Sequence, residues 1–171
     1  MIGRNIAPGI NREFASQEWA CIPKKAWFDA IKEANDKAEW DKPLKIYAND
    51  TDPEMVKLAK QNAELADVRD AINVMQRDAA DFKPKEDFGV IIGNPPYGER
   101  LEDAREVHQL YRKIGNAFRE FPYYSVYMIT SYVEFEKAFG RPATKRRKLY
   151  NGNIEVQFYQ YYGLRRKRPQ S

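Results

Sequence analysis

The chain has 171 residues, the size of one ordinary domain, and 43% of them are hydrophobic, which is enough for a packed core and excludes wholesale disorder. Apolar runs of about eighteen residues are absent, so the sequence predicts no membrane-spanning helix and indicates a cytoplasmic protein. One cysteine, Cys21, excludes an intramolecular disulfide framework, and one histidine, His108, excludes a His-rich metal site, so no bound metal is expected.

The net charge of +4 is unevenly distributed along the chain. From Arg141 to the end there are nine Lys and Arg residues and one acid, Glu155. Such a basic end favours a polyanionic partner, although a solubilising tail explains the same composition.

Hydrophobic periodicity places strands and helices alternately after an irregular lead-in at 1–23. Asp52 has the character of a helix N-cap, with Pro53 at the first helical position. In chain order, the expected elements are a helix at 24–39, a strand at 45–50, a helix at 53–66, strands at 71–76 and 88–93, a helix at 103–120, a strand at 125–131, a short helix at 134–139 that Gly140 ends, a strand at 154–162 and a basic tail at 163–171. The residues expected to face inward from the helix at 103–120 are Val107, Leu110, Tyr111, Ile114 and Phe118.

This alternation predicts an α/β fold with a mostly parallel sheet and helices on both faces, within one domain over 1–171. The strand at 88–93 is apolar enough to be covered on both faces. The segment 154–162 alternates apolar and polar residues, as an edge or antiparallel strand does. Ligands of such sheets bind beyond the carboxyl ends of the strands, so residues that directly follow strands are the candidate site.

The segment Gly93-Asn94-Pro95-Pro96-Tyr97 directly follows the apolar strand 88–93. The two prolines fix the backbone and supply no N–H donor, so the carbonyl groups of this loop have fixed directions. The Asn94 side-chain oxygen and the Pro95 carbonyl accept the two protons of a planar NH₂ group, and Tyr97 offers a face for stacking. Holding both protons out of the plane favours a pyramidal nitrogen whose lone pair points at a methyl donor.

The Asn-Pro-Pro-Tyr (NPPY) motif resembles that of class I amino-methyltransferases, which act on adenine N6, guanine N2 or protein glutamine. The strings NIAPGINREF at 5–14, GNPPYGERL at 93–101 and KRRKLYNG at 145–152 resemble more narrowly the bacterial 23S ribosomal RNA guanine-N2 methyltransferases that carry a THUMP domain. The resemblance covers nearly the whole chain. It implies a Rossmann-like fold, the cofactor S-adenosyl-L-methionine and catalytic roles for Asn94, Pro95, Pro96 and Tyr97.

The resemblance also implies a set of cofactor-binding residues. An acid at the end of the second strand of such enzymes accepts from the cofactor ribose; Asp50, with Thr51 beside it, is the better candidate, since Asp52 is explained as a helix cap. An acid after the next strand accepts from the adenine amine, and here Asp78 and Ala79 match better than Asp81. Asn94 completes the expected set.

Basic residues near the motif and near the chain end are the candidate RNA contacts. Arg100 is placed to reach a target phosphate, although a loop ion pair is an equal explanation. Lys145, Arg146, Arg147 and Lys148 form an unbroken run of four cations. The tyrosines at 159, 161 and 162 either stack on RNA bases or follow from strand alternation.

Two parts of the resembled enzymes have no counterpart in this sequence: the first strand with its Gly-rich loop, and the THUMP region. We therefore expect a partial methyltransferase domain, truncated from a longer protein, that binds the cofactor weakly or not at all and is inactive alone. A short gene product is the alternative.

The sequence thus predicts a methyltransferase that acts on a base amine, with guanine N2 of ribosomal RNA as the expected target and a role in rRNA processing. The alternatives are adenine-N6 methylation of DNA or RNA, protein-glutamine methylation, and a non-catalytic RNA-binding fragment. The expected partner is ribosomal RNA, without a membrane or a metal; the sequence makes no prediction of the oligomeric state.

Overall fold

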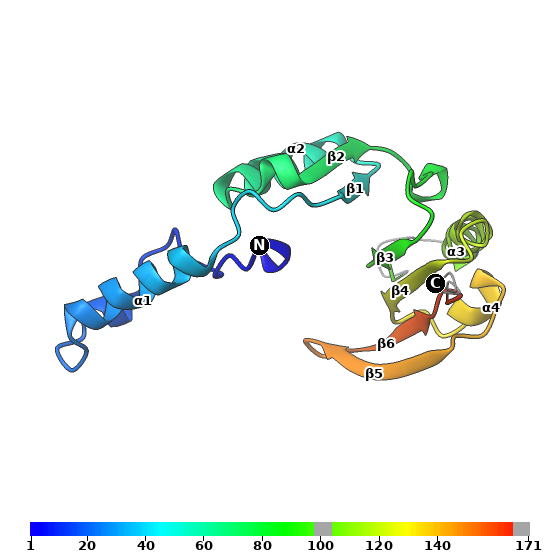
Figure 1. Ribbon diagram of the computed structural model, residues 1–171. Helices are drawn as coiled ribbons and strands as arrows, with labels where there is room; N and C mark the ends of the chain where they lie inside the picture. The colour runs from blue at the N-terminus through cyan, green and yellow to red at the C-terminus, as the bar shows by residue number, and fades with distance from the viewer. Residues whose placement is uncertain (98–103, 166–171) are drawn as a thin grey trace. The chain divides into compact units, whose positions relative to one another are not determined.

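The computed structural model describes residues 1–97 and 104–165. The chain divides into two compact units, Met1–Asp78 and Ala79–Ser171 (Figure 1).

The first unit contains a parallel pair of strands, β1 (Ile46–Asp50) and β2 (Ile72–Gln76), in a register that pairs Ile46 with Ile72 and Asp50 with Gln76. The helix α2 (Pro53–Leu65) connects them. The Asp52 carboxylate caps α2 by accepting a hydrogen bond from Glu54 N at 2.8 Å. The predicted cap and the first proline are therefore confirmed.

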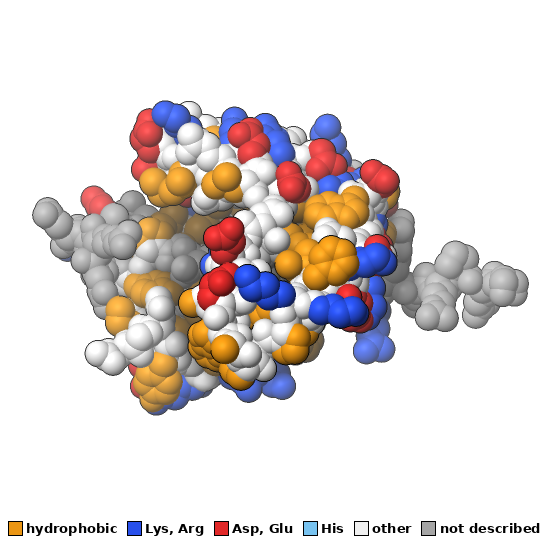
Figure 2. Space-filling view, turned by 90° about the vertical axis from the view of Figure 1, so that its left-hand side faces the viewer, with side chains coloured by type: hydrophobic (Ala, Val, Ile, Leu, Met, Phe, Trp, Pro, Cys, Tyr) orange, Lys and Arg blue, Asp and Glu red, His pale blue; other side chains and the backbone are white. Residues whose placement is uncertain are grey.

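The lead-in contains short 3₁₀ turns, η1 (Ile2–Arg4) and η2 (Ala15–Glu18), before the helix α1 (Lys24–Lys37). Arg4 is buried and forms an ion pair with Asp70 next to a small apolar cluster around Ile6 and Val68. By contrast, no residue of α1 is buried, and Phe28 is 68% exposed. Figure 2, which views the molecule from the side on which α1 lies in Figure 1, shows hydrophobic side chains at the surface among charged ones.

The second unit contains a four-stranded sheet in the order β3-β4-β6-β5. β3 (Gly89–Gly93) and β4 (Tyr124–Thr130) are parallel, and β6 (Ile154–Tyr161) is antiparallel to β4. The predicted antiparallel C-terminal strand is thus confirmed, but β6 is an internal strand, because β5 pairs with its other edge.

The helices α3 (Ala104–Phe118) and α4 (Phe135–Phe139) cover one face of this sheet (Figure 1). The predicted inward residues of α3 are confirmed, with Leu110 partly buried and the others fully buried. Gly140 ends α4 with a φ of 82°, a left-handed conformation that glycine adopts without strain. The buried members of this core are Val107, Tyr111, Ile114, Phe118, Val126, Met128, Phe135, Ala138, Phe139, Tyr159 and Tyr161.

The prediction that strand 88–93 is covered on both faces is wrong. Val90 and Ile92 are 60% and 78% exposed, and Phe88 is 62% exposed. They lie on the sheet face opposite α3 and α4, because Ile92 is in register with Tyr127 while Ile91 is in register with the buried Val126. Among the described residues of this unit, the helices cover one face of the sheet.

The strand β5 (Lys145–Asn151) was not among the predicted elements, because its run of four cations was interpreted only as a basic end. A turn at Gly152, which has a φ of 61°, joins β5 to β6. Lysine and arginine on an edge strand are a common means of discouraging further strand pairing. The Asn151-Gly152 pair between two strand-like runs was the local signal for this hairpin.

Within the described parts of the chain, no helix is long and apolar enough to cross a membrane. In the same residues, no group of three or more His, Cys, Asp or Glu side chains is placed to hold a metal ion.

Gly115 allows α3 and α4 to approach each other closely. A Cβ at this position would lie 2.3 Å from the backbone oxygen of Phe139, so the two helices would have to separate. We expect Gly115→Ala to lower the free energy of unfolding by about 1–3 kcal/mol, measured by urea denaturation. Gln109→Ala, at an exposed position of the same helix, is the control and should change it by less than about 0.5 kcal/mol. Equal stability of the two variants would contradict the close packing.

Candidate active site

The segment Asn94-Pro95-Pro96-Tyr97, here called the 94–97 loop, begins directly after the carboxyl end of β3. Asn94 and Pro96 are exposed, whereas Pro95 and Tyr97 are half-buried. An exposed amide beside partly buried rings suits a planar group that approaches from outside. Because the loop follows the carboxyl end of β3, it lies where a ligand of a parallel α/β sheet is expected to bind.

A series of hydrogen bonds connects this loop to α3 and to the end of β4. The Tyr111 hydroxyl, on α3, donates to the Pro96 carbonyl at 2.7 Å. It also lies 2.7 Å from Thr130 Oγ1, at the end of β4, which accepts from Tyr132 N at 3.0 Å. Tyr111 and Thr130 are both completely buried, so each hydroxyl needs these partners.

Burial also sets the ionisation of Tyr111, whose ring packs edge-on against Phe135 at a centroid distance of 4.9 Å. Loss of solvent raises the pKa of Tyr111 to about 12, and its contact with Thr130 offsets part of that rise. The phenol therefore stays protonated, and able to donate, across the physiological pH range.

In the first unit, Asp50 is the last residue of β1 and is exposed. Its Oδ1 accepts from Asp52 N at 2.9 Å, which among the described residues is the one hydrogen bond to this carboxylate. Thr51 is fixed through its carbonyl, which accepts from Gln76 Nε2 at 3.1 Å. Asp50 thus keeps an acceptor oxygen for a ligand, while Asp52 is engaged as the helix cap.

Asp78 follows β2 by two residues and lies at the same carboxyl edge as Asp50, since Arg77 N donates to the Asp50 carbonyl at 2.9 Å. Asp78 ends the first unit, and Ala79 begins the second in the 3₁₀ turn η4 (Ala79–Asp81). Asp81, the weaker candidate, is exposed in this turn.

The four basic residues at 145–148 lie on β5 and divide between its two faces. Arg146 forms an ion pair with Glu136 at 3.3 Å, and Lys148 with Glu155 at 2.6 Å. Lys145 and Arg147 lie on the opposite face, and no ion pair with another described residue engages them. Arg100, the other candidate RNA contact, lies outside the described residues, as does most of the basic tail.

Strand register places the β5–β6 hairpin relative to the 94–97 loop. Arg147 is in register with Phe158, and Phe158 with Ile129, which is one residue past the partner of Gly93. Arg147 is therefore level with Asn94, three strand spacings or about 14 Å away across the sheet. The tip of the hairpin extends beyond the ends of β3 and β4 at this edge (Figure 1).

The tyrosines near the chain end have separate roles. Tyr159 and Tyr161 are buried in the core, where Tyr159 packs on Phe135 and Tyr161 on Phe139. Tyr162 is 52% exposed. Strand alternation therefore accounts for the first two, and among these three only Tyr162 is free to stack on a base.

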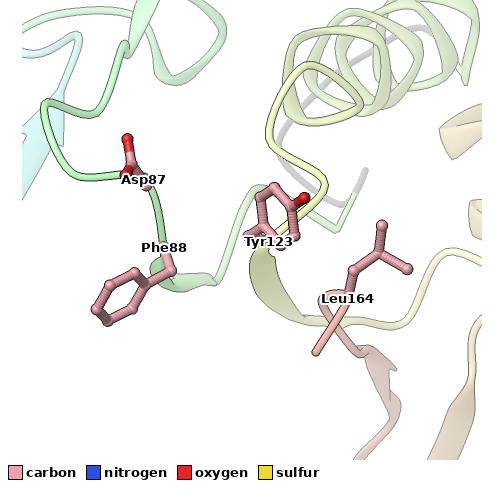
Figure 3. Close-up of a pocket in the computed structure, with 4 residues that line it drawn as sticks. All are labelled: Asp87, Phe88, Tyr123 and Leu164. Atoms are coloured by element: carbon pink, nitrogen blue, oxygen red, sulfur yellow. The ribbon is translucent and has the colours of Figure 1, made fainter. Parts of the chain in front are cut away.

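A shallow pocket of about 260 Å³ lies at the other end of the strands, lined by Asp87, Phe88, Tyr123 and Leu164. Figure 3 shows Asp87 and Phe88 just before β3 and Tyr123 just before β4. Phe88 lies six residues before Asn94, so the pocket is roughly 20 Å from the 94–97 loop at about 3.3 Å per residue. Its position at the amino ends of the strands makes it a poor candidate for the site.

Comparison with known protein families identifies the chain. The family model for an RMKL-like methyltransferase domain matches residues 1–160. The chain belongs to this family. The family match confirms the predicted class of methyltransferase.

Two relatives support this assignment. The chain is 49% identical over 170 residues to YpsC of Bacillus subtilis, whose name describes an RNA methyltransferase, and it covers 44% of that protein. It is 37% identical over 166 residues to ribosomal RNA large subunit methyltransferase K/L of Shewanella frigidimarina and covers 23% of it. The match spans 99% and 94% of this chain, so the chain corresponds to less than half of each relative.

Solved structures confirm the predicted Rossmann-like methyltransferase fold. SMU.472, described as a methyltransferase in complex with SAH, superposes with a TM-score of 0.93 at 42% identity, covering 98% of this chain and 44% of that one. A protein from Listeria monocytogenes, named as a predicted N6-adenine-specific DNA methylase, superposes with a TM-score of 0.88 at 48% identity, covering 95% of this chain and 42% of that one.

Sequence reasoning missed Tyr111 and Thr130 as parts of the site. Tyr111 was predicted only as an inward residue of a helix, and Thr130 only as part of a strand. Helical spacing indicates that Tyr111 is buried, but it gives no indication of which group its hydroxyl contacts.

Proposed function

We propose that this RMKL-like domain takes part in S-adenosylmethionine-dependent methylation of an exocyclic base amine, guanine N2 of large-subunit ribosomal RNA. The 94–97 loop is the observation that carries the proposal. It presents an exposed side-chain amide and rigid backbone carbonyls at the ligand-binding edge of the sheet. The name of the Shewanella relative supports large-subunit ribosomal RNA as the substrate.

The proposed reaction depends on orientation more than on a strong base. An exocyclic amine is a poor nucleophile because its lone pair is delocalised into the ring. The Asn94 Oδ1 and the Pro95 carbonyl each accept a hydrogen bond from one N–H of the amine, which favours a pyramidal nitrogen. Tyr97 stacks on the base and fixes its plane. Formation of the new N–C bond would break the methyl–sulfur bond of the sulfonium donor and leave its neutral thioether, and the nitrogen would lose one of its protons to solvent.

Bound S-adenosylmethionine would supply an electrophilic methyl group. The residues proposed to hold it are Asp50, Thr51, Asp78, Ala79 and Asn94. Asp50 fits this role, because its carboxylate is exposed at a strand end and retains an acceptor oxygen suited to a pair of ribose hydroxyls. Asp78, at the same edge, is the proposed acceptor for the adenine amine.

Lys145 and Arg147 are proposed to contact the RNA backbone, with Arg146, Lys148 and Arg100 as the other predicted contacts. Lys145 and Arg147 share a sheet face with Ile92 and lie level with the end of β3. Acidic neighbours already engage Arg146 and Lys148, which weakens their attraction for phosphate. A basic surface beside the loop favours a nucleic acid over a protein glutamine.

Adenine N6 is the second candidate target. The supporting observation is the name of the Listeria protein, and the 94–97 loop offers the same acceptors to an adenine amine. Analysis of the methylated base distinguishes the two targets.

The first prediction for this function concerns Asn94. In the catalytically active form of the protein, meaning this chain with any further segment that activity requires, Asn94→Ala should lower methyl transfer to ribosomal RNA by about 10²–10³-fold, because one fixed acceptor is lost. Transfer of labelled methyl is measured, and nucleoside analysis should find N2-methylguanosine.

The matched control is Asn153→Ala, which removes an exposed asparagine in the β5–β6 turn and should leave the rate within about twofold. An undiminished rate in Asn94→Ala would refute the catalytic role, whereas labelled N6-methyladenosine would replace guanine by adenine as the target.

The second prediction concerns the basic hairpin. Changing Lys145 and Arg147 together to Ser should reduce the slope of log affinity for RNA against log salt by about 1.4 to 1.8, since each phosphate contact contributes about 0.7 to 0.9. Changing Lys83 and Lys85, which are exposed and precede β3, to Ser is the control with the same loss of charge. Equal slopes for the two double variants would contradict the proposed interface.

The third prediction is that this chain by itself binds S-adenosylmethionine weakly or not at all and is inactive. Among the described residues, the side chains on the outer face of β3 are exposed. Calorimetric titration of the purified chain with the cofactor tests this directly. Micromolar affinity would refute it.

A further inference from the structure

The 94–97 loop has an unusual shortage of backbone donors. Pro95 and Pro96 carry no N–H, so this stretch cannot be anchored by donating backbone hydrogen bonds. The main chain of Pro95 and Pro96 can be fixed only through its carbonyl oxygens, and the structure shows such a contact at Pro96, where the Tyr111 hydroxyl lies 2.7 Å away.

Donor counting assigns the direction of every bond in the chain below the loop. A carbonyl only accepts, so the single proton of Tyr111 goes to Pro96. Tyr111 therefore accepts from Thr130, whose own proton is used in that bond. Thr130 in turn accepts from Tyr132 N, at the end of the series. Each hydroxyl thus donates once and accepts once, in one consistent direction from Tyr132 to Pro96.

This chain of bonds acts on the part of the loop that meets the base. Since the peptide unit is planar, fixing the Pro96 oxygen also fixes the N–H of Tyr97 and the direction in which the Tyr97 backbone continues. Thr130 ends β4 and Tyr111 lies on α3, so the hydrogen bonds connect the loop to a strand and a helix of the same packed core.

We propose that Tyr111 and Thr130 are positioning residues for methyl transfer: their hydroxyls fix the Pro96–Tyr97 peptide and thereby hold Asn94 and Tyr97 in place for the target base. The inference rests on the proposed function, because it concerns the same loop. Neither hydroxyl touches the substrate.

The first experiment measures kinetics in the catalytically active form of the protein. Tyr111→Phe should lower kcat about 10- to 100-fold, as expected for a slight misplacement of the target amine, while the KM for S-adenosylmethionine stays within about twofold. Thr130→Val should lower kcat in the same way, and Thr130→Ser, which keeps the hydroxyl, should restore it.

A control separates positioning from loss of stability. Ile114→Val removes buried volume from the same helix without touching the hydrogen bonds, and should lower the melting temperature with kcat unchanged. Wild-type kcat in Tyr111→Phe would overturn the inference, as would a failure of Thr130→Ser to restore the rate lost in Thr130→Val.

The second experiment uses this chain alone and does not depend on catalysis. Nitrogen-15 relaxation should show a lower order parameter for the Tyr97 amide in Tyr111→Phe and Thr130→Val than in the wild type, with recovery in Thr130→Ser. Unchanged order in Tyr111→Phe would overturn the anchoring. If the wild-type active form transfers no methyl group, the proposed function fails, and the relaxation result decides the anchoring by itself.

Discussion

The hydrogen bond from Tyr111 to the Pro96 carbonyl is the contact on which the candidate site depends. Two successive prolines make the 94–97 loop rigid but remove the donors that would tie it to the protein. A buried phenol, protonated because burial raises the pKa of Tyr111 to about 12, supplies the missing donor. The Tyr111 hydroxyl therefore connects the core directly to the loop that is proposed to receive the base amine.

The two faces of the sheet in the second unit carry different kinds of residues. Its inner face carries α3, α4 and a cluster of aromatic rings, which hold Tyr111 and Thr130 in place. Its outer face presents Ile92 near the loop and the cations Lys145 and Arg147 farther along. Alternate residues of a strand point to opposite faces of the sheet. The same strands therefore carry core residues on the inner face and the residues proposed to contact RNA on the outer face.

Much of this arrangement could be predicted from local sequence. The Asp52-Pro53 start of α2, the end of α4 at Gly140 and the inward face of α3 all follow from capping and periodicity, and all are confirmed. Family resemblance and the motif after β3 indicated a methyltransferase, and the family match confirms it.

The failures share a physical cause. Apolar composition shows that a strand can be buried, but whether a helix covers each face depends on the rest of the fold, so Val90 and Ile92 were wrongly expected to be covered. The strand β5 was missed because its cations were interpreted only as part of a basic end, although charge is common on an edge strand. The partner of the Tyr111 hydroxyl is fixed by packing between α3, β4 and the loop, which no local pattern encodes.

The central claim is that the 94–97 loop receives an exocyclic base amine. The most direct test is a crystal structure of the catalytically active form with a short RNA that contains the target base and a non-reactive analogue of the cofactor. The account predicts that the amine nitrogen lies about 2.7–3.2 Å from both Asn94 Oδ1 and the Pro95 carbonyl oxygen, with the base stacked on Tyr97. A base bound away from this loop, or with its amine turned from both oxygens, would contradict the account.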